Sequence, residues 1–320
     1  MKALRFENGE LKISGVRMPD EPSEALVRVT RSGICNTDLE IVRGYAGFQG
    51  TIGHEFVGIV EASPGRRELE GKRVVGEINV GCGKCELCSA GDSRHCAART
   101  VLGIHGRDGA HAEFLTLPAR NLIEVPEEVS DEEAVFVEPL AAAISIAEQV
   151  EIGPDTKVAI IGDGKLGLLC AMALSLQSEN LVLIGKHTPK LSIARRCGIE
   201  AIMTAEAAKM HRRFDVAVEA SGSESGFAAA LDVVRPRGKI VLKSTFQGRP
   251  KWEAWRVVVD EITIIGSRCG LFAPAIELLA SKRIRVGGLI SDEFALKDGV
   301  AAVSRASENG VLKVTLRMQD

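Results

Sequence analysis

Four cysteines lie close together in one glycine-containing loop, and their spacing suits a metal ion. Two residues separate Cys82 from Cys85 and Cys85 from Cys88, and seven separate Cys88 from Cys96. A tetrahedral Zn²⁺ takes four thiolates at about 2.3 Å, and tight turns bring such sulfurs together. An iron–sulfur cluster, which also uses four thiolates, is the main alternative. Because a closed set of four ligands leaves no open coordination position, we expect a structural zinc here.

A second set of possible metal ligands is spread over the first half of the chain. A catalytic zinc keeps one position open for water or substrate, so about three protein ligands of mixed type are enough. The candidates are Cys35, His54, Glu55 and Glu138. Each has an ordinary interpretation alone, as a core cysteine, a solvated loop pair or a carboxylate at a helix start. Their occurrence together with a four-cysteine loop favours a second, open zinc site.

A glycine-rich turn follows the apolar run Val158–Ile161 and precedes a predicted helix over Leu166–Leu176. The turn has the pattern GxGxxG and contains Gly162, Gly164, Lys165, Leu166 and Gly167. Glycines at these places allow a tight turn, close approach of a pyrophosphate and close helix packing, and the helix N-terminus favours the anion. Because the pattern lies between a strand and a helix, it predicts dinucleotide binding.

The next predicted strand, Leu181–Ile184, carries information on which dinucleotide binds. An Asp or Glu at its end would accept a hydrogen bond from the ribose 2′-hydroxyl of NAD. Here the strand is followed by Gly185, Lys186 and His187, with Lys190 nearby. A missing carboxylate with adjacent cations favours the 2′-phosphate of NADP, although a solvated turn would look the same. We therefore predict NADP over NAD.

The remaining sequence indicates how these groups are positioned. The first part of the chain is rich in short β-type runs broken by turns, for example Ala25–Thr30, Phe56–Ala62, Arg73–Ile78 and Ala112–Leu117. From Lys157, continuous apolar strands alternate with helices, which predicts a doubly wound parallel sheet covered on both faces. We expect an α/β protein with a β-rich catalytic domain over 1–140 and 280–320 and a dinucleotide-binding domain over 141–279.

Composition excludes several classes of protein. The 320 residues are 45% hydrophobic and 26% charged, with a net charge of −3, so charge gives no reason to expect nucleic acid or an anionic membrane as a partner. No apolar run approaches the roughly 20 residues needed to cross a bilayer. The first residues match neither a signal nor a transit peptide. We expect a cytoplasmic protein, in which the eight cysteines stay reduced.

Taken together, these pieces resemble the medium-chain, zinc-dependent alcohol dehydrogenase family, particularly its polyol- and threonine-dehydrogenase-like branch. The matching segments are Gly-Ile-Cys-Asn-Thr-Asp at 33–38, Gly-His-Glu-Phe-Val-Gly at 53–58, the four-cysteine loop, Val-Glu-Pro-Leu-Ala at 137–141 and the dinucleotide fingerprint. They occur in the order of the family and span most of the chain. The resemblance implies a GroES-like catalytic domain, a Rossmann domain, an active site in the cleft between them, and a homodimer or homotetramer.

The resemblance also implies roles for individual residues. Cys35 and His54 would ligate the catalytic zinc, Glu55 would be a near or exchangeable ligand, and Glu138 would complete the set. Thr37 matches the hydroxyl that contacts the substrate oxygen and starts a proton relay. Many members have a histidine three residues later, where this chain has Glu40, so the relay ends in a carboxylate or passes through water. His105 and His111 flank glycine-rich turns without an evident partner, and we interpret them as structural.

These observations lead to one main hypothesis and two alternatives. The main one is a zinc-dependent oxidoreductase that transfers a hydride between NAD(P) and a small alcohol or carbonyl compound, such as a secondary alcohol, polyol or sugar-like molecule. The first alternative is a reductase of activated double bonds, as in zinc-free relatives, which lack this ligand set. The second is a non-catalytic dinucleotide-binding redox sensor. The sequence does not identify the substrate, because small changes in pocket shape shift preference.

Overall fold

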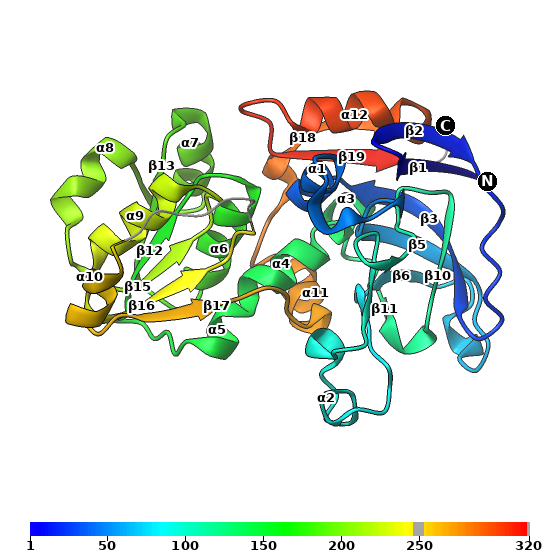
Figure 1. Cartoon of the computed structure of the whole chain (residues 1–320), viewed down its shortest axis with the longest axis horizontal. Helices are drawn as coiled ribbons and strands as arrows, with labels where there is room; N and C mark the ends of the chain where they lie inside the picture. The colour runs from blue at the N-terminus through cyan, green and yellow to red at the C-terminus, as the bar shows by residue number, and fades with distance from the viewer. Residues whose placement is uncertain (246–252, 319–320) are drawn as a thin grey trace. The chain divides into compact units, whose positions relative to one another are not determined.

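The structure is a computed structural model that describes residues 1–245 and 253–318 (Figure 1). The chain divides into two compact units, one of Met1–Glu138 with Phe272–Asp320 and one of Pro139–Leu271. The expected boundary at residue 280 therefore differs from the observed one, because helix α11 (Phe272–Ala280) belongs to the first unit. The Phe272 amide donates to the Glu77 carboxylate of the same unit at 3.2 Å, which fixes the start of this helix.

The first unit is built on mainly antiparallel sheets, with β18 parallel to β19 and β8 parallel to β9. Its largest sheet has the order β11-β6-β5-β3-β19-β18, with β10 also pairing with β3. The strands are β11 (Leu122–Glu124), β6 (Arg73–Gly76), β5 (Glu55–Ala62), β3 (Ala25–Gly33), β19 (Lys313–Arg317), β18 (Ile290–Ala295) and β10 (Phe114–Leu117). Two three-stranded sheets complete it: β2 (Glu10–Gly15), β1 (Lys2–Glu7) and β4 (Gly50–Thr51), and β7 (Asn79–Val80), β8 (Thr100–Leu102) and β9 (Gly106–Arg107).

Strand β3 shows why this sequence forms a sheet of that kind. Ala25, Val27 and Val29 are buried, while the residues between them are partly exposed. Such alternation places apolar side chains on one face of a strand, which suits a sheet with one solvated side. The unit's helices are short: α1 (Asn36–Val42), α2 (Glu86–Ser89), α3 (Asp131–Ala134), α11 and α12 (Gly299–Ala306), with α4 (Val137–Ile144) crossing into the second unit.

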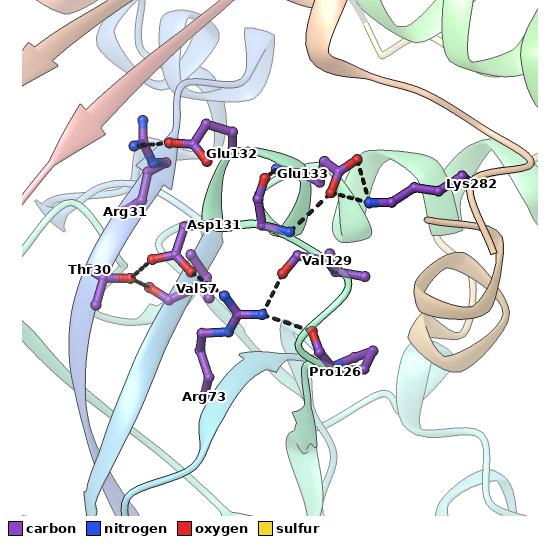
Figure 2. Close-up of polar contacts among 11 residues, drawn as sticks. Thr30, Arg31, Val57, Arg73, Pro126, Val129, Asp131, Glu132, Glu133 and Lys282 are labelled. Atoms are coloured by element: carbon purple, nitrogen blue, oxygen red, sulfur yellow. Dashed lines mark hydrogen bonds and ion pairs between the residues drawn. The ribbon is translucent and has the colours of Figure 1, made fainter. Parts of the chain in front are cut away.

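Helix α3 is anchored by charge at its first turn, as Figure 2 shows. Its three successive carboxylates each have a basic partner: Asp131 with Arg73 (3.1 Å), Glu132 with Arg31 (2.5 Å) and Glu133 with Lys282 (2.8 Å). Ser130 and Glu133 also form a capping box. Negative charge at a helix start interacts favourably with the helix dipole. These contacts hold the segment that leads directly into Glu138.

The second unit contains a six-stranded parallel sheet with the order β14-β13-β12-β15-β16-β17 (Figure 1). Its strands are β12 (Lys157–Ile161), β13 (Asn180–Gly185), β14 (Glu200–Met203), β15 (Phe214–Glu219), β16 (Val234–Leu242) and β17 (Thr263–Gly266). Its helices are α5 (Ile146–Gln149), α6 (Lys165–Leu174), α7 (Thr188–Arg196), α8 (Thr204–Ala207), α9 (Glu224–Val233) and α10 (Ala254–Val259). The predicted doubly wound parallel sheet is confirmed.

The central strands of this sheet are apolar without alternation. In β12 and β13 every residue after the first is buried, as expected where helices cover both faces. The strand order reverses at β12, which lies between β13 and β15. In open parallel sheets, ligands bind beyond the carboxyl ends of the strands at such a reversal. Among the described residues, no helix is both long and apolar enough to span a bilayer.

The capping box of α3 makes a measurable prediction. Ser130→Ala removes the hydroxyl that accepts from the Glu133 amide at 3.3 Å, and we expect it to lower the free energy of unfolding by about 1 kcal/mol. Urea denaturation would measure the change. Ser192→Ala, on the exposed side of α7, serves as the control and should cause no loss. Equal stability of Ser130→Ala and wild type would show that the ion pairs hold α3 without the cap.

Candidate metal centres and cofactor site

The four predicted sulfur ligands come together around α2. The Sγ atoms of Cys82, Cys85, Cys88 and Cys96 all lie within 4.8 Å of one another, and all four thiols are free. Four sulfurs at about 2.3 Å from a tetrahedral zinc would be roughly 3.8 Å apart, so the donors fit that ion. A Cβ atom at Gly81 would lie 2.6 Å from Cys88 Sγ, which explains the glycine before the first ligand.

The local backbone favours thiolates in this loop. The amides of Lys84 and Cys85 donate to the Cys82 sulfur and lower the pKa of Cys82 to about 6. The Cys82 amide in turn donates to Cys96 Sγ at 3.4 Å. Because a thiolate is the form that binds a metal ion, these amides prepare the loop for zinc.

The second predicted ligand set is brought together in part. Donor atoms of Cys35, His54 and Glu55 lie within 4.8 Å of one another, with both His54 and Glu55 buried. Cys35 is the N-cap of α1, and Glu55 is the first residue of β5. Glu138, in the first turn of α4, is not a member of this group. The group therefore has three donors of mixed type, which is the composition expected of an open zinc site.

A carboxylate that sequence reasoning missed, Asp38, organises these ligands. It is fully buried, and its oxygens accept from the Cys35 amide at 2.8 Å and the Gly53 amide at 3.1 Å. Its Oδ1 lies 3.5 Å from His54 Nδ1, so Nε2 is the nitrogen that would face a metal ion. Burial alone would lower the pKa of His54, but the carboxylate of Asp38 and the sulfur of Cys35 together raise it well above its usual value.

His111 lies on the other side of Asp38. Its Nε2 is 3.6 Å from Asp38 Oδ2, and its Nδ1 is 2.8 Å from the Ser32 hydroxyl. The ring is fully buried, and a Cβ at Gly53 would lie 2.5 Å from it. These contacts support the structural interpretation of His111 and supply partners that were not evident in the sequence. Folding places it against a carboxylate 73 residues earlier in the chain, which local sequence cannot show.

Glu55 has a cationic partner that the sequence did not indicate. Lys313 Nζ is paired with Glu55 Oε2, and both side chains are completely buried. The same ammonium lies 5.4 Å from the centroid of the Phe136 ring. Glu55 Oε1 has no hydrogen-bond partner among the described residues and is available to a metal ion. Lys313 is the first residue of β19 and is fully buried, and a buried lysine needs a partner of opposite charge.

The two residues of the predicted proton relay lie on α1. Thr37 Oγ1 is 3.8 Å from Cys35 Sγ, so its hydroxyl is next to the ligand group. Glu40, one turn further along, is paired with Arg43 at 2.7 Å. The hydroxyl is therefore at the site, whereas the carboxylate is engaged in an ion pair.

The glycine-rich turn has the geometry that a dinucleotide requires. Gly162 has a φ of +116°, and a Cβ there would lie 2.8 Å from the backbone of Ser221. A Cβ at Gly167 would lie 1.9 Å from the Gly162 carbonyl oxygen, so helix α6 packs directly on the turn. Gly164, the N-cap of α6, has open space on its Cβ side and no side-chain cap. The residues present fit a bound pyrophosphate at this helix start.

The turn after β13 carries the residues predicted to select the cofactor. Lys186 and His187 are exposed, and Lys190 lies in the first turn of α7. Sequence reasoning missed Asp163, whose carboxylate accepts hydrogen bonds from the amides of Lys186 at 2.7 Å and His187 at 2.6 Å. Asp163 occupies a variable position of the GxGxxG pattern, which gave no reason to single it out.

Comparison with known proteins agrees with this geometry. Residues 21–127 match the family model described as the alcohol dehydrogenase GroES-like domain, and residues 166–281 match that of zinc-binding dehydrogenases. The L-threonine 3-dehydrogenase of Deinococcus deserti is 33% identical over 294 residues, which cover 83% of each protein. The chain belongs to the zinc-dependent medium-chain alcohol dehydrogenase family. The resemblance inferred from the motifs is confirmed, and with it the GroES-like and Rossmann domains.

Solved structures of this dehydrogenase family extend the comparison over the whole chain. A protein of Sinorhizobium meliloti 1021 with NADP bound is 26% identical, with a TM-score of 0.90 and 99% of each chain covered. The alcohol dehydrogenase rspB of Escherichia coli CFT073, solved with NADH, is 27% identical, with the same TM-score and coverage. The chain is therefore an oxidoreductase of the zinc-binding dehydrogenase type that transfers a hydride between a nicotinamide dinucleotide and an alcohol or carbonyl substrate.

The Glu55–Lys313 pair generates a stability prediction. Lys313→Met leaves a buried carboxylate without its cation, and we expect the free energy of unfolding to fall by about 3–5 kcal/mol. Glu55→Gln combined with Lys313→Met should recover most of that loss, because no buried charge remains. Arg317→Met, at the exposed end of the same strand, is the control and should change stability by at most about 1 kcal/mol. No recovery in the double variant would contradict this account.

Proposed function

We propose that this dehydrogenase oxidises a secondary alcohol, polyol or sugar-like substrate, with Cys35 and His54 as ligands of a catalytic zinc. The observation that carries the proposal is the mixed group of Cys35, His54 and Glu55 within 4.8 Å, with Glu55 Oε1 unpartnered among the described residues. The separate group of four thiols supports a structural zinc at Cys82, Cys85, Cys88 and Cys96. Zinc bound by the open group would polarise a carbonyl or stabilise an alkoxide.

The surrounding residues hold the open site in one arrangement. The Asp38 carboxylate lies 3.5 Å from His54 Nδ1 and accepts hydrogen bonds from the Cys35 and Gly53 amides. Lys313 forms an ion pair with Oε2 of Glu55, whereas Oε1 has no partner among the described residues and could approach a metal ion. We assign Glu55 as an exchangeable ligand for this reason. Glu138 remains the proposed additional ligand, on a segment that α3 anchors.

Proton transfer is assigned to Thr37. Its hydroxyl, next to Cys35, would accept the proton of the substrate hydroxyl as the hydride leaves carbon. The Glu40 carboxylate is instead engaged by the Arg43 guanidinium at 2.7 Å. We therefore propose that the proton leaves Thr37 through water, while Glu40 has a role in holding α1.

NADP is the proposed cofactor. The end of β13 has a glycine where NAD-binding domains have a carboxylate, and Lys186 and His187 are exposed beside it. Lys190 adds a third basic side chain at the start of α7. Cations at this place favour the 2′-phosphate.

A homo-oligomer in the cytoplasm completes the proposal. Strand β17 ends the order of its sheet as far as the chain is described, so one of its edges is free to pair. Helix α10 presents Trp255, Val258 and Val259, exposed to 60%, 76% and 68%. Exposed apolar side chains and a free strand edge in the same unit both favour association of two copies. Eight free thiols suit a reducing compartment.

Metal analysis tests the two zinc sites separately. We expect two zinc ions per wild-type chain and one in Cys35→Ser, with alcohol oxidation reduced at least about a hundredfold because the Lewis acid is lost. NADPH binding should be retained and tighter than NADH binding. Cys85→Ser is the matched control: it should also lose one zinc, mainly lowering thermal stability. One zinc per wild-type chain, unchanged in Cys35→Ser, would favour the zinc-free reductase or the sensor.

A charged substitution in α10 tests whether two copies of the protein associate through this helix. Val258→Glu introduces a carboxylate into the exposed apolar patch, and we expect it to shift the oligomer toward monomer by at least about tenfold in dissociation constant. Sedimentation at a series of concentrations measures this shift. Val300→Glu, at an exposed position of α12, is the control and should leave association unchanged. Identical sedimentation of both variants and wild type would contradict the proposed interface.

A further inference from the structure

The chain supplies a carboxylate at the end of β13 from an unusual source. Gly185, the last residue of β13, has no side chain, and a Cβ built there would lie 2.5 Å from both Cβ and Oδ2 of Asp163. The side chain of Asp163 therefore fills the space that the side chain of residue 185 would need. A carboxylate therefore does lie at the end of β13, but it belongs to Asp163 of the glycine-rich turn after β12.

The carboxylate of Asp163 is directed into the turn that follows β13. Its Oδ2 accepts from the amides of Lys186 and His187 at 2.7 and 2.6 Å. The His187 ring nitrogen Nδ1 lies 3.0 Å from Oδ1 and 3.1 Å from Oδ2. Asp163 is only 6% exposed. Burial alone would raise the pKa of Asp163, but hydrogen bonds from the His187 ring and from the amides of His187 and Lys186 lower it.

These contacts decide which groups of the turn remain available to a ligand. Because both oxygens of Asp163 already accept hydrogen bonds inside the protein, the carboxylate is poorly placed to read a ribose hydroxyl. With Nδ1 of His187 facing Asp163, Nε2 is the nitrogen left to face a ligand, on a side chain that is 48% exposed. Lys186 Nζ, on the same turn, lies 3.5 Å from the Ser225 hydroxyl at the start of α9.

The hydroxyl of Ser225 belongs to a short chain of polar groups. Ser225 Oγ is 3.2 Å from Ser223 Oγ, which is 2.9 Å from Ser221 Oγ, and Ser221 donates to Glu219 at 2.6 Å. These serines follow β15, and the Lys186–His187 turn follows β13. Both strands are adjacent to β12, where the strand order reverses (Figure 1). A lysine, a histidine and a serine hydroxyl thus lie at the edge of the sheet where a dinucleotide binds.

We propose that Asp163 is a specificity-determining positioning residue for the cofactor: it holds the Lys186–His187 turn so that both side chains face a 2′-phosphate. The inference rests on the proposed NADP preference and adds the residue on which that preference depends. Asp163 would not touch the phosphate itself. If Asp163 faced the cofactor instead, its negative charge would repel a 2′-phosphate. Removing the charge would then strengthen binding of the phosphate, whereas it weakens binding if Asp163 holds the turn.

Calorimetric binding of adenosine 2′,5′-bisphosphate and of 5′-AMP to the full chain separates these possibilities, because neither probe needs zinc or turnover. Wild type should bind the bisphosphate more tightly than 5′-AMP. Asp163→Asn should weaken bisphosphate binding roughly tenfold or more, the size expected when one charge-assisted contact is lost, and change 5′-AMP binding by at most about twofold. Lys186→Ala should have the same selective effect.

Asp215→Asn is the matched control. Asp215 also accepts from a backbone amide, that of Lys157 at 2.7 Å, and pairs with Arg235, but at the opposite ends of the strands. It should leave the ratio of the two affinities unchanged. If Asp163→Asn does not melt cooperatively, His187→Ala removes the ring that Asp163 holds, and it should lower the ratio at least about threefold.

The outcomes distinguish the two levels of the proposal. A selective wild type with an unchanged ratio in Asp163→Asn and in His187→Ala overturns the role of Asp163 alone. Tighter bisphosphate binding by Asp163→Asn also overturns it, and would show that the carboxylate faces the ligand. A wild type that binds both probes equally removes the NADP preference, and this inference with it.

Discussion

The arrangement of Cys35 and His54 depends on one buried negative charge, the carboxylate of Asp38. Its two oxygens accept from the amides of Cys35 and Gly53, which belong to different segments of the chain, and face the rings of His54 and His111. A buried carboxylate without such partners would be costly, so these contacts form together or not at all. The sulfur of Cys35 and the ring of His54 are adjacent because both segments are held by the same side chain.

How far the sequence predicted the site depended on whether the signal was local. The four-cysteine loop and the glycine-rich turn are each contained in a few residues, and both were predicted with their ligands and fold context. Asp38 stands within a recognised motif, yet its role depends on His54 and on His111, which come from other segments. Lys313 is 258 residues from Glu55, and no pattern around it distinguishes a buried lysine from an exposed one.

The same distinction holds for the fold. Continuous apolar runs predicted the strands of the second unit closely, because burial on both faces leaves a strong pattern. The boundary near residue 272 was not predicted, because α11 joins the first unit through contacts with distant residues such as Glu77. Asp163 was missed for a related reason: its carboxylate lies next to β13 only after the parallel sheet has formed.

The place of β19 in the sheet has a consequence for how the enzyme is made. Strand β19 pairs with β3 and carries Lys313, whereas β3 and β5 are synthesised near the start of the chain. The whole second unit is inserted between these strands in the sequence. On the ribosome, the cationic partner of the Glu55 carboxylate is therefore made only after the whole second unit has been translated. The Glu55–Lys313 pair can therefore form only after the sequence of the nucleotide-binding unit has been synthesised.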